Sequence, residues 1–412
     1  MKYPVKSILF LGIGGVSMHQ LAIAMKDMGV KVFGYDQQHN KYTKICEQHG
    51  IKVSHKFVKE FCAVDVCVAT GGFKHAKYYS YLNKNNIPIL DRAEVLGWIS
   101  QKFKTVIAVA GTHGKSTTAT LIYEILRTAG KNVSCHIGAD VRSSRFSLSD
   151  EILVVEACEY NKSFLKLKPT YSVVTNVEQE HMDSYGNFFN LRSAFLTFLK
   201  RGKKRFVFKE KSTDFFKRVS GVDFVEINNS VQTKLKGEYN LKNVSLAVEV
   251  CKSLGVGESD IKQVVSKFSG IPRRYQYLGE YQNGKIYLDY AHHPTEIKSF
   301  LTTFKEENTN IQIIFQPHTY SRTKSFFNEF VSVLSDYKNL IIYKEYPARE
   351  KKFQGKSAKD LFLAIKEINP HVKYCTNEKM LITNLLNNCS IAFVGAGDIN
   401  LIAESLVLKA KF

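Results

Sequence analysis

The sequence predicts an α/β protein of three domains, each built on a mainly parallel sheet. The chain has 412 residues, and at about 150 residues per domain this length suits two or three domains. Short apolar, β-branched runs alternate with helical patterns, as in βαβ units. Polar or breaker-rich stretches at 101–104 and 270–274 interrupt this alternation. They divide the chain into segments 1–102, 103–270 and 271–412.

The apolar runs define the expected strands. They are Ile8–Leu11, Lys31–Tyr35, Val64–Val68, Ile87–Leu90, Thr105–Ala110, Ile152–Val155, Ser172–Thr175, Ile286–Tyr290, Ile311–Phe315, Leu340–Tyr343 and Ile391–Val394. In open α/β sheets, ligands bind beyond the carboxyl ends of the strands. The residues that follow each run are therefore the candidate functional residues.

A glycine-rich loop follows the first strand, with Gly12, Gly14 and Gly15 ahead of Ser17. Asp36 ends the second strand, about where an acid binds a ribose hydroxyl in dinucleotide-binding domains. Ser17 occupies the position of the third glycine, so the match to that fingerprint is incomplete. The pattern favours a nucleotide diphosphate over NAD, and NAD over simple packing.

A second loop, AGTHGKSTT at 110–118, follows the strand Thr105–Ala110 and opens a helix. Its glycines allow backbone N–H groups to surround phosphate oxygens, and the helix presents its positive end to them. Lys115 is placed to reach the β- and γ-phosphates, and the Ser116 hydroxyl to bind magnesium. Val109 stands where the usual phosphate loop has its first glycine. The loop is thus a shortened form of the usual phosphate loop, and it predicts a nucleoside triphosphate site. The alternative is a glycine-rich turn that only begins a helix.

Acids and a histidine follow two other strands of the central segment. Glu156 comes after Ile152–Val155, and His181 lies beyond Ser172–Thr175. Parallel neighbouring strands would bring both ends to the edge where the phosphate loop emerges, so we expect magnesium ligands there. Cys158 has no evident base nearby in the sequence, and a packed thiol is the simpler interpretation.

Two polar loops follow strands of the third segment. Asp289 and His292 belong to DYAHHPT at 289–295, and His318 and Arg322 belong to QPHTYSRT at 316–323. Arg274 lies at the preceding breaker. An arginine can hold a carboxylate or phosphate through two parallel bonds, so these loops predict an anionic substrate.

The amino-acid composition argues against several classes of protein. Apolar residues make up 44% and charged residues 23%, as in globular proteins rather than disordered or fibrous ones. The net charge of +20 fits a lysine-rich surface better than a nucleic-acid partner, because there is no arginine-rich arm. No apolar run has the length of a membrane helix, and the 8 cysteines show no CxxC spacing. We expect a cytoplasmic protein, monomeric or homodimeric, without a disulfide framework or membrane insertion.

Together these motifs resemble the Mur ligases, the ATP-dependent amide-forming enzymes of peptidoglycan precursor synthesis. The matching segments run in order along the chain. They are GIGGVSM (12–18), DRAEVLG (91–97), AGTHGKSTT (110–118), EACEY (156–160), TNVEQEHMD (175–183), YNLKN (239–243), RR (273–274), DYAHHPTEI (289–297), FQPHTYSRTK (315–324) and GAGDI (395–399).

The resemblance implies a Rossmann-like domain over 1–102 for a UDP-sugar, a phosphate-loop ATPase domain over 103–270, and a Rossmann-like amino-acid-binding domain over 271–412. The implied site residues fall into four groups. Gly12, Gly14, Gly15, Ser17 and Asp36 bind the UDP-sugar; Gly111, Thr112, His113, Gly114, Lys115, Ser116, Thr117, Asn240, Asn243, Arg274 and Asp289 bind ATP; Ser116, Glu156 and His181 bind Mg²⁺; and His292, His318 and Arg322 lie near the sugar carboxylate and the amine. Lys115, Glu156, His181, His292 and Arg322 are the implied catalytic residues.

The implied reaction joins L-alanine to the lactyl carboxylate of UDP-N-acetylmuramate through an acyl phosphate, which serves cell-wall biogenesis, cell shape and division. Three alternatives stay open: a relative that attaches a recycled peptide to the same sugar, an NAD-dependent oxidoreductase, and a non-catalytic nucleotide-binding protein. The stretch between His181 and Asn240 is shorter than is usual in the family. Tyr239 replaces a common histidine and Leu288 a common aspartate.

Overall fold

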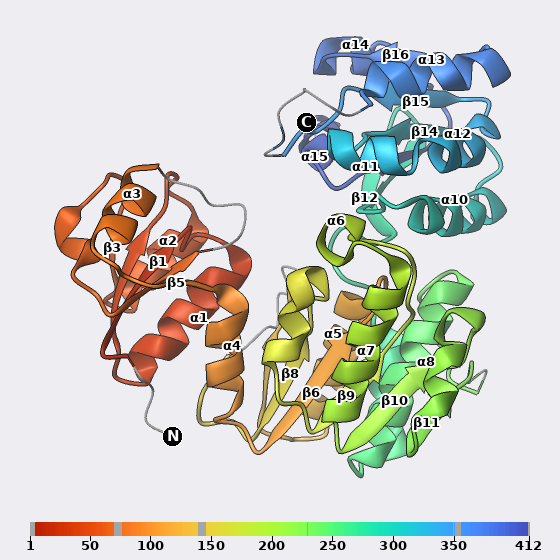
Figure 1. The fold of residues 1–412 in the computed structure, drawn as a ribbon. Helices are drawn as coiled ribbons and strands as arrows, with labels where there is room; N and C mark the ends of the chain where they lie inside the picture. The colour runs from red at the N-terminus through yellow and green to blue at the C-terminus, as the bar shows by residue number, and fades with distance from the viewer. Residues whose placement is uncertain are drawn as a thin grey trace. The chain divides into compact units, whose positions relative to one another are not determined.

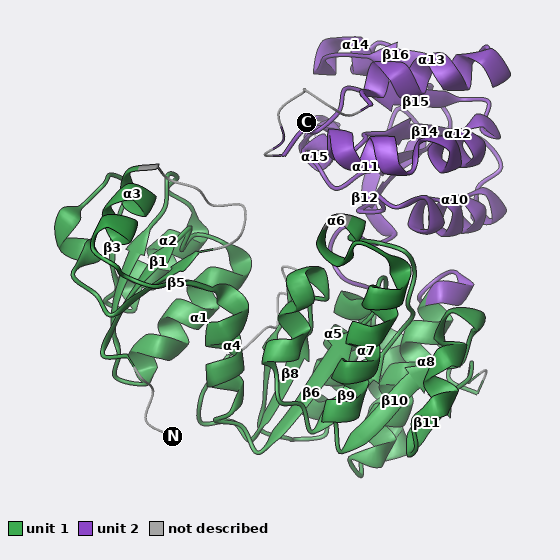
Figure 2. Cartoon of the chain, in the orientation of Figure 1, with its two compact units in different colours: residues 1–234, 240–269 green, residues 235–239, 270–412 purple. Residues whose placement is uncertain are grey.

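The structure is a computed structural model that describes residues 5–69, 76–138, 146–228, 230–348, 350 and 356–410. Its strands form three separate sheets flanked by helices (Figure 1). The predicted α/β class is therefore confirmed. The chain divides into two compact units (Figure 2): unit 1 contains residues 1–234 and 240–269, and unit 2 contains residues 235–239 and 270–412.

The first sheet of unit 1 has the strand order β3-β2-β1-β4-β5, and all its pairs are parallel. Its elements are β1 (Ser7–Leu11), α1 (Val16–Asp27), β2 (Lys31–Tyr35), α2 (Lys41–Gln48), β3 (Lys52–Ser54), η1 (Lys59–Cys62), β4 (Val66–Ala69), α3 (Ala76–Lys84), β5 (Ile89–Asp91) and α4 (Arg92–Ser100). The central strand β1 is almost entirely apolar and buried, as expected for a parallel strand covered on both faces.

The second sheet of unit 1 has the order β11-β10-β9-β6-β8-β7 and is also parallel throughout. Its elements are β6 (Thr105–Ala110), α5 (Lys115–Thr128), β7 (Val133–His136), β8 (Ile152–Glu156), η2 (Tyr160–Lys166), β9 (Tyr171–Val174), α6 (Met182–Tyr185), α7 (Phe188–Arg201), β10 (Lys204–Phe208), η3 (Lys211–Arg218), β11 (Val222–Val225), α8 (Glu238–Ser253) and α9 (Glu258–Lys267). Strand β6 lies between β8 and β9, so the loops after these three strands emerge at one edge.

Both sheets of unit 1 contribute to one hydrophobic core. A single buried cluster contains Phe10 and Val68 from the first sheet and Val106 and Val155 from the second. At Gly97 on α4, a Cβ atom would lie 2.6 Å from the carbonyl oxygen of Lys166 at the end of η2. Glycine is needed there because the two backbones approach so closely.

Unit 2 contains the third sheet, of order β12-β13-β17-β14-β15-β16. Its elements are β12 (Gln276–Tyr281), β13 (Gly284–Asp289), α10 (Pro294–Glu307), β14 (Ile311–Phe315), α11 (Tyr320–Ser325), α12 (Phe327–Ser335), β15 (Leu340–Tyr343), α13 (Ala358–Ile368), β16 (Lys373–Cys375), α14 (Glu378–Ile382), β17 (Ser390–Val394) and α15 (Ile399–Lys409). Strands β13, β17 and β14 are parallel neighbours. The two polar loops that follow β13 and β14 therefore emerge at the same edge of the sheet.

Every predicted strand overlaps an observed one, and the described residues contain six further strands that the sequence patterns do not predict: β3, β7, β10, β11, β12 and β16. Strand β12 also breaks the parallel arrangement, since it pairs antiparallel with β13. The connection is the two-residue turn of Gln282 and Asn283, both with positive φ, a geometry typical of tight hairpins. None of the helices that the structure describes is both long enough and apolar enough to cross a membrane.

Candidate active site

The phosphate loop lies between β6 and α5, and its shape depends on two glycines. Gly111 has φ +144°, and a Cβ atom there would lie 1.9 Å from Oγ1 of Thr175. Gly114 has φ +80°, and its Cβ would lie 2.2 Å from Oδ1 of Asn243. Any larger residue would collide with the end of β9 or with α8, so the loop conformation requires glycine at both positions.

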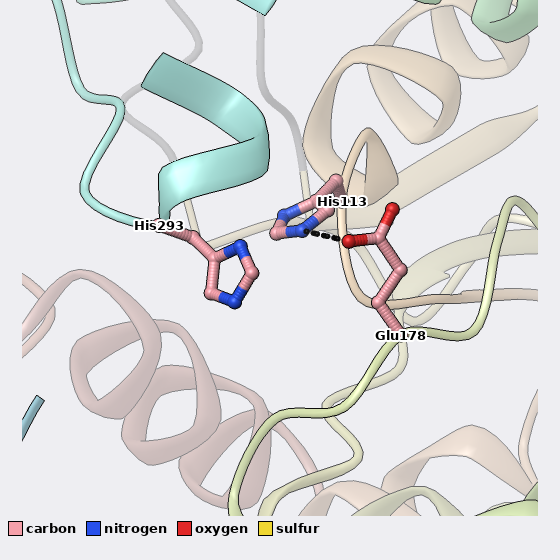
Figure 3. Close-up of side chains that lie close together, drawn as sticks. All are labelled: His113, Glu178 and His293. Carbon is pink, nitrogen blue, oxygen red and sulfur yellow. Dashed lines mark ion pairs between the residues drawn. The ribbon is translucent and has the colours of Figure 1, made fainter. Parts of the chain in front are cut away.

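The segment after β9 braces the same loop. The backbone N–H groups of Thr112 and His113 donate to the backbone oxygen and to Oδ1 of Asn176 (3.1 and 2.8 Å). The Thr175 hydroxyl donates to the carbonyl oxygen of His113 (2.6 Å). The His113 ring lies 3.6 Å from the Glu178 carboxylate (Figure 3). These contacts hold the loop in place. The next predicted residue, Thr117, is buried on α5.

The ammonium group of Lys115 is held by protein acceptors. Its Nζ donates to the carbonyl oxygens of Gly111 (2.6 Å) and Thr112 (3.0 Å) and to Oε1 of Glu159 (3.1 Å). Burial acts to lower the pKa of Lys115, but the charges of Glu159 and then Glu156 outweigh it, and the pKa is raised. Lys115 is therefore a permanent cation at the start of α5, as phosphate binding requires.

Ser116 and Glu156, two of the predicted magnesium ligands, are in direct contact. The Ser116 hydroxyl donates to Oε2 of Glu156 (2.9 Å), and the same carboxylate oxygen accepts from the N–H of Gly138 (3.0 Å). A hydroxyl and a carboxylate are the hard oxygen ligands that Mg²⁺ prefers. The donor set therefore fits the predicted cation.

His181, the third predicted ligand, contacts a different pair of acids. Its Nε2 lies 3.6 Å from Oε1 of Glu159 and 3.9 Å from Oε2 of Glu180. The possible ligand atoms of these three residues all lie within 4.8 Å of one another. Glu159 also binds Lys115, so one carboxylate connects the phosphate loop to the histidine.

The two predicted adenine-facing residues lie on α8. Asn243 accepts a hydrogen bond from the Thr118 hydroxyl (3.3 Å) and packs against Gly114. Asn240 is buried one turn earlier. The structure thus places Asn243 directly beside the phosphate loop.

In the first sheet, the glycine-rich loop and Asp36 are in direct contact, which the sequence patterns did not predict. The Asp36 carboxylate accepts from the N–H of Gly14 (2.8 Å), and a Cβ at Gly14 would lie 2.9 Å from that carboxylate. Gly12 has φ +82° and donates to the carbonyl oxygen of Tyr35 (2.7 Å). Gly15 caps the amino end of α1. Asp36 therefore shapes the loop itself.

Ser17 links the two sheets of unit 1. Its hydroxyl contacts Nε2 of His136 at the end of β7 (2.9 Å) and accepts from Arg92 on α4 (2.9 Å). Burial, and next the charges of Arg92 and His19, lower the pKa of His136 to about 3. The ring is therefore neutral at physiological pH.

In unit 2, Arg274 lies just before β12, and Asp289 is the last residue of β13. Arg274 donates to Glu296 (3.3 Å). The Asp289 carboxylate accepts from the N–H groups of Tyr275 and Ala291 (2.7 Å each). Burial raises the pKa of Asp289 to about 6, although Arg274 and these two N–H groups oppose the shift.

His292, His318 and Arg322 form one cluster in unit 2. The rings of His292 and His318 are 5.9 Å apart, and an Arg322 nitrogen lies 3.1 Å from Nδ1 of His318. Burial, and next the charge of Arg322, lower the pKa of His318 to about 4. The structure thus brings together the two polar loops that follow β13 and β14.

Sequence reasoning missed several residues at these sites: Glu159, Glu178, Glu180, Arg92, His136 and Glu296. Glu159 stands inside the EACEY segment and Arg92 inside DRAEVLG, so the motifs contained them without indicating a role. His136 lies at the end of a strand that the apolar pattern did not predict.

Comparison with known proteins points to the same family as the sequence motifs, over nearly the whole chain. Residues 7–104 match the catalytic domain of the Mur ligase family, residues 109–220 the Mur ligase middle domain, and residues 273–403 the Mur ligase glutamate ligase domain. A UDP-N-acetylmuramate–L-alanine ligase from Caldicellulosiruptor bescii is 33% identical over 450 residues, covering 97% of this chain and 98% of the relative. The chain belongs to the Mur ligase family. The family predicted from the motifs is confirmed.

Solved structures show the same fold. The UDP-N-acetylmuramate–alanine ligase of Thermotoga maritima superposes with a TM-score of 0.80 at 22% identity and covers 99% of both chains. A murein peptide ligase from Psychrobacter arcticus gives a TM-score of 0.70 at 19% identity over 98% of both chains. Membership of the family means that the enzyme is an amide-forming ligase that uses a nucleotide, as predicted.

Proposed function

We propose that this enzyme joins L-alanine to the lactyl carboxylate of UDP-N-acetylmuramate with hydrolysis of ATP to ADP and phosphate. The observation that carries the proposal is the contact network of Lys115, Ser116 and Glu156 at the phosphate loop, in a chain aligned almost end to end with a ligase of that name. The product is a peptidoglycan precursor.

The reaction has two steps in this proposal. A carboxylate oxygen of the sugar attacks the γ-phosphorus of ATP, which forms an acyl phosphate and releases ADP. The amine of L-alanine then attacks the acyl carbon, and phosphate leaves while the amine loses a proton. Both steps bring anionic oxygens together, so positioning and electrostatic stabilisation provide most of the catalysis. Lys115 supplies a fixed positive charge beside the phosphates.

Mg²⁺ belongs to this proposal as the second source of positive charge. Ser116 and Glu156 would hold it through oxygen atoms, and His181 through a ring nitrogen. A bound Mg²⁺ neutralises charge on the phosphate oxygens. Asn240 and Asn243 would face the adenine, and Arg274 and Asp289 would hold the nucleotide from their own domain.

The remaining roles follow the three-domain division at 1–102, 103–270 and 271–412, which we keep as a functional proposal. Gly12, Gly14, Gly15, Ser17 and Asp36 would hold the UDP-sugar in the first domain. His292, His318 and Arg322 would bind carboxylates in the third. We also propose that the reaction takes place in the cytoplasm.

The test is the mass of the product formed from UDP-N-acetylmuramate, ATP and an equimolar mixture of amino acids. We expect a single product heavier by one alanine residue, with one ADP released per product. A parallel reaction with a tripeptide in place of the amino acids separates L-alanine ligation from peptide recycling. Faster ADP release with the tripeptide would reject the proposed substrate, and ADP release independent of any amine would reject the ligase reaction.

A further inference from the structure

Glu159 occupies an unusual position for a carboxylate. It is 2% exposed, and its Oε1 atom lies 3.1 Å from Nζ of Lys115 and 3.6 Å from Nε2 of His181. Buried acids are rare unless they are paired. The two groups that pair with Glu159 are the proposed phosphate-binding and cation-binding residues.

Glu159 is also the acceptor that comes from outside the phosphate loop. An ammonium group has three protons to donate, and two of the acceptors of Lys115, the carbonyls of Gly111 and Thr112, belong to its own loop. The third acceptor, Glu159, follows β8. The Lys115–Glu159 bond therefore fixes the lysine tip relative to a second strand of the sheet.

The backbone around Glu159 is held in a strained turn. Asn161 and Lys162 have φ values of +51° and +56°, a left-handed conformation that is unfavourable for most non-glycine residues. Such strain persists where surrounding contacts enforce it, often at functional sites. The N–H of Lys162 donates to the carbonyl oxygen of Glu159 (2.9 Å) and helps to close this turn.

The turn that carries His181 is strained as well, and the two turns brace each other. His181 has φ +58° and caps the amino end of α6. From α6, the Tyr185 hydroxyl donates to the carbonyl oxygen of Glu159 (2.5 Å), and the Ser184 hydroxyl donates to Oδ1 of Asn161 (2.9 Å). A displacement of either turn would therefore displace the other.

We propose that Glu159 is a positioning residue that holds Lys115 and His181 in a fixed mutual geometry, so that these two residues act as one unit toward the triphosphate. Glu159 acts through its two partners and is not itself a catalytic residue. This inference rests on the proposed function, because the triphosphate is the ligand that both partners would serve.

The test is a double-mutant cycle with Glu159→Gln, Lys115→Met and the double variant. Glutamine keeps the shape of Glu159 and removes its charge, and the double variant contains neither buried charge, so it leaves no unpaired ion in the core. Asp150→Asn is the matched control, since Asp150 is also a buried acid of unit 1 and bonds the Ser134 hydroxyl. Binding of a non-hydrolysable ATP analogue is measured by titration calorimetry, and turnover by ADP release.

We expect E159Q to lower kcat about tenfold or more, while the KM for UDP-N-acetylmuramate stays within about twofold of wild type. We expect the double variant to bind the analogue no more weakly than K115M, because residues that act through one another are non-additive. Asp150→Asn should change neither quantity by more than about twofold. Penalties that add in the double variant, or an E159Q enzyme that behaves like D150N, would overturn the inference.

Failure of the proposed function gives a different result. If the wild-type enzyme makes no product from UDP-N-acetylmuramate and L-alanine but the binding cycle is non-additive, the assigned substrates are wrong and the role of Glu159 stands. If product forms and the cycle is additive, the reaction stands and Glu159 has an independent role.

Discussion

His136 should make the stability of unit 1 sensitive to mild acid. Its ring is 2% exposed, and the pKa is lowered from 6.5 to about 3, first by burial and then by the charges of Arg92 and His19. Between these two values the unfolded chain binds a proton that the folded protein does not. Unfolding is therefore favoured as the pH falls below about 6.5.

The size of the effect follows from the two pKa values. With 6.5 for the unfolded chain and about 3 for the fold, lowering the pH from 7 to 5 removes about 2 kcal/mol of stability. The result depends little on the lower value, because His136 is already neutral in the fold at pH 5. A loss of this size is a large part of the stability of an ordinary domain.

His136→Gln removes the titrating group and places an amide where it can still contact the Ser17 hydroxyl. Urea unfolding at pH 7 and pH 5 can be followed through Trp98, the one tryptophan of the chain, which lies on α4 in unit 1. We expect wild type to lose about 2 kcal/mol more than the variant between the two pH values. His49→Gln, at an exposed position after α2, is the control and should behave as wild type. Equal losses in wild type and H136Q would refute the argument.

Three further results are expected. Lys115→Ala should abolish ADP release, because it removes the ammonium group that contacts the loop carbonyls and supplies positive charge beside the phosphates; release at the wild-type rate would contradict the role assigned to Lys115. Gly97→Ala should destabilise unit 1 by about 1–3 kcal/mol, since its Cβ would lie 2.6 Å from the Lys166 carbonyl, and an unchanged urea midpoint would show that α4 shifts freely. Asp289, with a pKa of about 6 instead of 3.8, holds its proton longer in the fold than in the unfolded chain, so stability falls as the pH rises. Between pH 4 and pH 7, the free energy of unfolding of unit 2 should fall by about 2 kcal/mol more in wild type than in Asp289→Asn, measured by hydrogen exchange in β13. Parallel pH profiles for the two proteins would contradict the raised pKa of Asp289.

Most of the strands that the sequence patterns predict are largely buried, although the predicted β5 is only partly buried and the fully buried β7 was not predicted. Thr105–Ala110 and Ile311–Phe315 agree with β6 and β14 at both ends, because an uninterrupted apolar run is typical of the centre of a parallel sheet. The missed β3 and β16 are three-residue edge strands with only partial burial. Their sequences carry no apolar run, and pairing with a neighbouring strand determines that they are extended.

In the candidate site, too, the sequence predicts local features and misses contacts between distant segments. Gly111, Gly114, Lys115 and Ser116 are predictable because the phosphate loop is local: its backbone shape and its side chains follow from one short segment. Glu159 is not predictable, because its role depends on a lysine 44 positions earlier in the chain and on a turn held by α6. Two residues so far apart in the sequence cannot be recognised as a pair until the fold brings them together.

By itself, the sequence determined the α/β class, the phosphate loop, the order of the strand-end motifs and the family. These are encoded by local periodicity and by residue types at short spacing. Only the tertiary structure decided that the first two sheets share one core, that Ser17 meets His136, and that one buried carboxylate serves both Lys115 and His181. Those contacts join segments far apart in the chain, and burial and charge pairing act on them only after the sheets have packed.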